Sequence, residues 1–130
     1  MEGLLEGIIA SCGSPVDRTV EIAVPLLSTL TTSFLGAEAC VERGAVEGLM
    51  ASMEREHRDV KVFSICCLAN LAAHEPLRPR LEPSVPVLQR VATESPWSVA
   101  KKEAAYVLSL LEKPVAQDVE VHRILDEVDR

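Results

Sequence analysis

A ten-residue segment occurs twice in this chain, and its repetition limits the folds that the chain can adopt. Residues 3–12 read GLLEGIIASC and residues 44–53 read GAVEGLMASM, with five identical positions and one apolar residue exchanged for another at the other five. The same shift, which maps Gly3 onto Gly44, aligns three further apolar pairs: Val24 with Ile65, Leu27 with Leu68, and Leu30 with Leu71. One register kept across two segments and the turn between them predicts a repeated structural unit.

Apolar residues recur at helical spacing along most of the chain. In DVKVFSICCLANLAAH, apolar or small residues fall on one helical face at Val60, Ser64, Cys67, Leu68 and Leu71. No segment alternates as a strand would. Glycine and proline clusters separate the periodic segments, which predicts an all-α chain with helices at 3–12, 17–32, 36–43, 45–54, 58–74, 84–94, 97–112 and 117–129.

A second, slightly shorter shift continues the pattern by mapping Val60 to Val99, Leu68 to Val107 and Leu71 to Leu110. A helical period of roughly 40 residues is typical of solenoids built from stacked helices. Residues 36–74, and above all the segments RGAVEGL and CLANLA, resemble one repeat of the armadillo family. The resemblance implies an armadillo-like right-handed superhelical solenoid of about three repeats. Residues 1–130 then form one domain, with a partial first repeat at 1–35, a central repeat at 36–82, a degenerate third repeat at 83–113 and a capping helix at 114–130.

Glycine and proline predict local details of these helices. Gly44 lies where a short helix must end in a sharp turn, which favours a positive φ. Gly7 and Gly48 lie inside helices, where glycine costs about 1 kcal/mol relative to alanine, so both predict close helix–helix contact. Pro25 lies inside the second helix and predicts a kink or a break there. The proline-rich segment 74–86 is not expected to form one helix.

The charge and the cysteines restrict the partners and the compartment. The net charge of −7, with only short basic doublets, argues against nucleic acid and against an anionic membrane surface. No stretch approaches the roughly 20 apolar residues of a spanning helix. The four cysteines include no CxxC, so we expect reduced, mostly buried thiols in a protein of the cytoplasm or nucleus.

Residues suited to catalysis are scattered. No glycine-rich phosphate loop and no cluster of cysteine and histidine at zinc spacing occurs, so no cofactor, no metal and no catalysis are expected. A small helical enzyme with Cys66 or Cys67 as nucleophile is the minor alternative.

The third helix of each repeat supplies the candidate binding surface, because armadillo proteins bind extended peptides along a groove lined by these helices. The family's asparagine, which hydrogen-bonds the peptide backbone, corresponds to Asn70; the family's tryptophan falls on Cys66, which argues against a nuclear-import receptor. Helical spacing places the predicted groove at Arg18, Ile22, Pro25 and Thr29, then Asp59, Phe63, Cys66, Asn70 and Ala73, then Ser98, Lys102, Ala105 and Ser109. Two alternatives stay open: Ile22 and Phe63 are core residues, and Asn70 makes a local bond between helices.

These features predict a non-catalytic scaffold that binds another protein, as an extended peptide or an amphipathic helix, in the concave groove. The apolar start of the chain, LLEGII, also favours an alternative. In that alternative the chain is an assembly module, or part of a larger repeat protein, that associates through its terminal faces.

Overall fold

The computed structural model describes residues 3–112 and is all-α over that range, with no strand in it. Its elements are α1 (Leu4–Cys12), α2 (Asp17–Leu30), α3 (Phe34–Glu42), α4 (Ala45–Met53), α5 (Arg58–Ala72), the 3₁₀ helix η1 (Glu75–Ser84), α6 (Val85–Glu94) and α7 (Ser98–Glu112). The seven helices predicted within 3–112 are confirmed with small differences at their ends. The predicted helix at 117–129 and the capping segment 114–130 lie outside the described residues.

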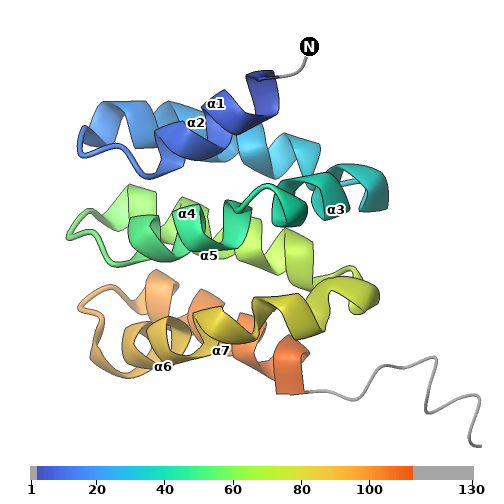
Figure 1. Ribbon diagram of the computed structural model, residues 1–130. Helices are drawn as coiled ribbons and strands as arrows, with labels where there is room; N and C mark the ends of the chain where they lie inside the picture. The colour runs from blue at the N-terminus through green and yellow to red at the C-terminus, as the bar shows by residue number, and fades with distance from the viewer. Residues whose placement is uncertain (1–2, 113–130) are drawn as a thin grey trace, which may run out of the picture.

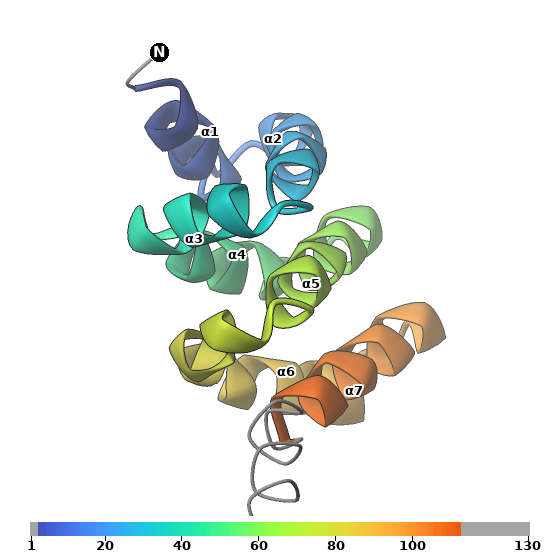
Figure 2. The same ribbon diagram turned by 90° about the vertical axis from the view of Figure 1, so that its right-hand side faces the viewer.

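The helices form three stacked pairs, α1 with α2, α4 with α5, and α6 with α7 (Figure 1). Seen from the side, α2, α5 and α7 follow one another along one side of the molecule, and α1, α4 and α6 lie on the other side (Figure 2). Helix α5 packs against both α2 and α7, and α4 packs against α1. The short elements α3 and η1 link one pair to the next.

An aliphatic core holds the pairs together. Its largest fully buried side chains are Leu27, Leu49, Met53, Ile65, Leu68, Leu71, Leu81 and Leu88. Each side chain of this size contributes about 1.5–3 kcal/mol when it leaves water. With so few aromatic residues in the chain, the core depends on many such aliphatic contacts between neighbouring helices.

Two glycines of the repeated segment behave as predicted, and a third does not. Gly44 precedes α4 with φ of 90°, a left-handed conformation that glycine adopts without steric cost. A Cβ on Gly48 would lie 3.4 Å from the carbonyl oxygen of Ile9, so α4 and α1 are in close contact there. The same prediction is wrong for Gly7, because no atom of another helix in the described residues lies within 4 Å of the Cβ it would carry.

The prolines have milder effects than the sequence predicts. Helix α2 continues from Asp17 to Leu30 through Pro25, so a break at that position is wrong. Pro25 lies on the exposed side of α2, where water can bond the carbonyl that loses its helical partner. The segment expected not to form one helix is a ten-residue 3₁₀ helix, η1, which carries Pro79 and Pro83 in its interior and buries Leu77 and Leu81.

Candidate functional site

The helices that carry the predicted groove residues, α2, α5 and α7, follow one another along one side of the molecule (Figure 2). On α2 and α5, Arg18, Ile22, Thr29, Asp59 and Phe63 are exposed, and Cys66 and Asn70 are half-buried. Ile22 is 53% exposed and Phe63 is 41% exposed, so the alternative that both belong to the core is excluded.

The predicted register is wrong by one residue on α7. Helix α5 begins at Arg58 and α7 at Ser98, so the true shift is one position longer than the shift that maps Val60 to Val99. The buried residues confirm the longer shift, since Val60, Ser64 and Cys67 correspond to Ala100, Ala104 and Val107.

The assignment of Lys102 and Ser109 to the positions of Phe63 and Asn70 is therefore incorrect, as is that of Ala105 to the position of Cys66. Phe63 corresponds to Glu103, Cys66 to Tyr106 and Asn70 to Leu110. Asp59 corresponds to Val99 instead of Ser98. The misplacement arises because Val99, Val107 and Leu110 are all apolar, although only Val107 is buried. Apolar spacing alone therefore does not show which of them face the core.

We define the α2–α5–α7 face by its corrected residues: Arg18, Ile22, Pro25 and Thr29 on α2; Asp59, Phe63, Cys66 and Asn70 on α5; and Val99, Glu103, Tyr106 and Leu110 on α7. Tyr106 is 54% exposed and Val99 is 43% exposed. The charge of Glu103 acts on the thiol of Cys66, which is consistent with the two side chains lying on one face.

Asn70 ties α5 to the end of α2. Its Nδ2 donates to Ser28 Oγ at 2.8 Å, and the Ser28 carbonyl and Thr31 Oγ1 lie at 3.3 and 3.4 Å. The bond between helices that the sequence left as an alternative is therefore present. Among the described residues no hydrogen bond is made to Asn70 Oδ1, so only the acceptor half of the amide is left for another molecule.

Cys66 is not chemically activated in this surface. Burial, and secondarily the carboxylate of Glu103, raises the pKa of its thiol above the usual value. A thiol held in its protonated form is a poor nucleophile. Within residues 3–112 no group of three His, Cys, Asp or Glu side chains could hold a metal ion.

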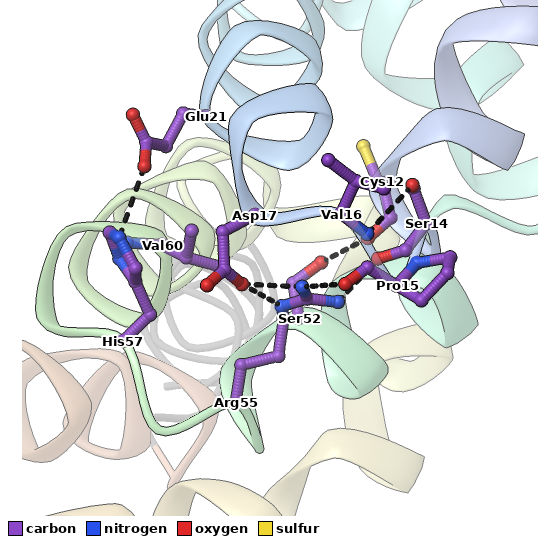
Figure 3. A network of polar contacts seen from close by, with 10 residues as sticks. All are labelled: Cys12, Ser14, Pro15, Val16, Asp17, Glu21, Ser52, Arg55, His57 and Val60. Atoms are coloured by element: carbon purple, nitrogen blue, oxygen red, sulfur yellow. Dashed lines mark hydrogen bonds and ion pairs between the residues drawn. The ribbon is translucent and has the colours of Figure 1, made fainter.

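A network of polar contacts fixes the start of α2 against the turn before α5 (Figure 3). Arg55 donates to the carbonyl of Pro15 at 2.8 Å, to the carbonyl of Ser14 and to Asp17 Oδ1 at 2.9 Å. The hydroxyl of Ser52 donates to the carbonyl of Cys12 at 2.6 Å. The charged segment REHRD gives no sequence signal for this role, because the partners of Arg55 are mostly backbone carbonyls of the turn between α1 and α2.

His57 completes this network at the first turn of α5. Its Nδ1 accepts from the backbone N–H of Val60 at 3.2 Å, and its Nε2 lies 3.0 Å from Glu21 Oε1 (Figure 3). The imidazole therefore caps α5 and joins it to α2. Together with Arg55, it sets the alignment of the two helices that carry Ile22 and Phe63.

A hollow of about 280 Å³ near the ends of α4 and α6 is lined in part by a buried lysine, Lys61. Its Nζ donates to the carbonyl of Met53 at the end of α4, where a positive charge is favourable. Burial lowers the pKa of this ammonium, and the nearby Glu56 and Glu54 partly oppose that change. These contacts give Lys61 a structural role as the cap of α4.

A second hollow, of about 430 Å³, lies on the outer side of α1 and α2. It is lined by Gly3, Leu4, Gly7, Ile8, Ser11, Thr19, Ile22, Ala23 and Leu26, and none of these residues is charged. Ile22 is the one residue that this hollow shares with the α2–α5–α7 face.

Comparison with known proteins shows similarity at the level of the fold. No protein-family model and no curated protein matches the chain. A solved structure titled "Crystal Structure of Engineered Protein. Northeast Structural Genomics Consortium Target OR329" aligns over 82% of this chain with a TM-score of 0.74 and 24% identity. The aligned region covers 44% of that engineered protein. None of the helices in residues 3–112 is long and apolar enough to cross a membrane.

Proposed function

We propose that the chain is an armadillo-like right-handed solenoid and acts as a non-catalytic scaffold, binding a peptide or helix of another protein along the α2–α5–α7 face. The armadillo assignment is supported by the regular spacing of the helices. Helices α2, α5 and α7 begin at Asp17, Arg58 and Ser98, and α3 and η1 begin at Phe34 and Glu75. Each of these shifts is close to the roughly 40 residues of an armadillo period. The element η1 then takes the place of the short first helix in the third repeat, and the first repeat contributes α1 and α2.

The observation that carries the binding function is the set of exposed apolar and aromatic side chains that α2, α5 and α7 contribute to this one face. Ile22, Phe63 and Tyr106 are each more than two-fifths exposed, and none of them is needed to fill the core. Exposed aromatic residues grouped on one surface are typical of interaction sites, where each can act as an anchor.

The distribution of charge on this face indicates the chemistry of the partner. Arg18 and Asp59 lie at the beginning of α2 and α5, and Glu103 lies on α7. Between these charges, Ile22, Pro25, Phe63 and Cys66 are uncharged, and the carboxylate of Glu103 lies close enough to act on the Cys66 thiol. A partner segment with apolar side chains facing α2 and α5 and a polar or basic residue facing Glu103 fits this arrangement, as an amphipathic helix or an extended peptide does.

The four cysteines support a reducing compartment for the scaffold. Cys12, Cys40, Cys66 and Cys67 are all free thiols, and burial raises the pKa of each. Proteins of oxidising compartments that need added stability usually pair their cysteines. We therefore place the scaffold in the cytoplasm or nucleus.

Selection of peptides against the immobilised full-length chain tests the binding function. Peptides from a random display library are isolated, and their affinity is measured for the natural chain and for Phe63→Ala and Tyr106→Ala. Loss of an aromatic anchor is expected to weaken binding at least tenfold, or about 1.4 kcal/mol.

Leu35→Ala serves as the matched control, because Leu35 is 77% exposed but belongs to α3. Asn70→Ala is a less clean variant, since it also removes a bond between α5 and α2. Peptides whose affinity is unchanged by both aromatic substitutions, in chains with intact helical spectra, would exclude this face as the binding site.

A further inference from the structure

The hollow on α1 and α2 has the composition of a covered surface, although no described residue covers it. We call it the end face and define it by its lining residues on the two helices: Leu4, Gly7, Ile8 and Ser11 on α1, and Thr19, Ile22, Ala23 and Leu26 on α2. Leu4 is 55% exposed and Leu26 is 51% exposed. An apolar surface rimmed by polar residues is unusual for a protein that acts alone.

The next helix pair shows what the end-face positions are suited for. With the shift that maps Gly3 onto Gly44, six of them correspond to Ala45, Leu49, Ser52, Val60, Ser64 and Cys67, and all six of these are fully buried. They are buried where α4 and α5 pack beneath α1 and α2. The end face therefore repeats, on the outside of the molecule, a set of positions that form an interface inside it.

Gly7 shows that the end face also has room for close approach. Its counterpart Gly48 is contacted by α1, with the Ile9 carbonyl oxygen 3.4 Å and the Cys12 Cβ 3.6 Å from the Cβ it would carry. At the corresponding point of Gly7, no atom of another helix in the described residues lies within 4 Å. A helix from another molecule can reach the backbone of α1 at this point without displacing a side chain.

We propose that a second copy of this chain occupies the end face, so that two molecules associate through α1 and α2 about a two-fold axis. A two-fold contact joins a surface to itself, so a charged surface would meet its own charge. The end face carries no charged side chain, whereas the chain as a whole carries a net charge of −7. Two copies can therefore meet without like-charge contact here, while the acidic remainder of the surface opposes other arrangements.

The size of the end face sets the expected strength of the association. Its eight residues are far fewer than the roughly 20–30 a side of a standard interface. We therefore expect a reversible dimer with a dissociation constant on the order of 100 µM. The dimer is independent of peptide binding on the α2–α5–α7 face, apart from the shared edge at Ile22.

Sedimentation of the full-length chain over about 5–500 µM, a range that brackets the expected dissociation constant, tests the proposal. The natural chain is expected to change from the monomer mass of 14.1 kDa towards twice that value as the concentration rises. Added salt is expected to strengthen the association, because it screens the repulsion between acidic surfaces while apolar contacts persist. A chain that stays monomeric at the highest concentration would overturn the proposal and leave the end face to a different helical partner.

Point substitutions assign the association to the end face. Leu26→Glu and Leu4→Glu each place a charge in the contact at an exposed side chain and are expected to weaken the dimer at least tenfold, with helical spectra unchanged. Leu35→Glu is the matched control on α3, and Phe63→Ala is the control for the α2–α5–α7 face; both are expected to dimerise like the natural chain. Dimerisation that survives Leu26→Glu and Leu4→Glu, or that Leu35→Glu also abolishes, would show that another surface is responsible.

Discussion

The two serines of the repeated segment offer a matched pair for measuring what the contact between repeats contributes. Ser52 is fully buried, and its hydroxyl donates to the carbonyl of Cys12 at 2.6 Å, with the Gly48 carbonyl at 3.0 Å as a second acceptor. Cys12 is the last residue of α1, so its carbonyl has no partner within that helix. Ser11 occupies the same position one repeat earlier, where its hydroxyl donates to the Gly7 carbonyl at an exposed site.

We expect Ser52→Ala to destabilise the chain by about 1–2 kcal/mol. A buried acceptor left without a donor costs about 1–3 kcal/mol, and the better helix propensity of alanine returns about 0.5 kcal/mol. The melting temperature should fall by roughly 3–5 °C for each kcal/mol lost. Ser11→Ala leaves no buried acceptor unpaired, so its stability should equal or slightly exceed that of the natural chain.

Urea denaturation followed by circular dichroism, at a few micromolar protein, provides the two free energies of unfolding. This concentration keeps any association through the end face out of the measurement. Equal effects of the two substitutions would refute the reasoning, because they would show that the Ser52 hydroxyl contributes nothing beyond a bond within its own helix.

Three further predictions concern glycines, thiols and a cap. Gly7→Leu should stabilise the monomer by up to about 1 kcal/mol, whereas Gly48→Leu should destabilise it by about 1–3 kcal/mol through overpacking against α1. If urea denaturation showed changes of the same sign in the free energy of unfolding for both variants, the contact at Gly48 would be contradicted. Burial raises the pKa of Cys12 to about 11 and that of Cys67 to about 12, from the ordinary 9.0. Both thiols hold their protons more tightly in the folded chain, so the free energy of unfolding should be unaffected below pH 9. From pH 9 towards 12 it should fall by up to about 1.4 kcal/mol per pH unit for each thiol. The decline should be shallower in Cys67→Ala. His57→Ala should cost about 1 kcal/mol by removing the cap of α5 and His57→Asn should cost less, so identical melting temperatures for the two variants would argue against the capping role.

Helix positions can be predicted from this sequence because the apolar spacing and the glycine and proline breaks agree with each other. Features that depend on contacts between repeats can be predicted only in part. Gly7 and Gly48 lie in closely similar local sequences, yet only Gly48 is packed, since packing depends on which helix lies opposite. The register of α7 is mispredicted because Val107 fits the apolar pattern with either of two shifts that differ by one position.

The candidate site shows the same division. The sequence places Ile22 and Phe63 on the surface correctly, because their register depends on α2 and α5, where several apolar pairs determine the shift. It misses Tyr106, because the position of that residue depends on α7. The donor bonds of Asn70 to the end of α2 cannot be distinguished in advance from an amide kept free for a peptide, since both uses require the same residue type.

The polar contacts described above have one further consequence, which concerns how the chain comes apart. Each described side-chain hydrogen bond between helix pairs joins residues 36 to 43 positions apart, from Arg90 with Glu54 to His74 with Thr31. No such bond among them links the first pair to the third. Either outer helix pair can therefore separate while the hydrogen bonds between the other two pairs persist. The central pair, α4 and α5, has a neighbouring pair on both sides, so it keeps bonds to one neighbour when the other separates. We therefore expect unfolding to proceed from the ends inward, with the central pair the last to lose its structure.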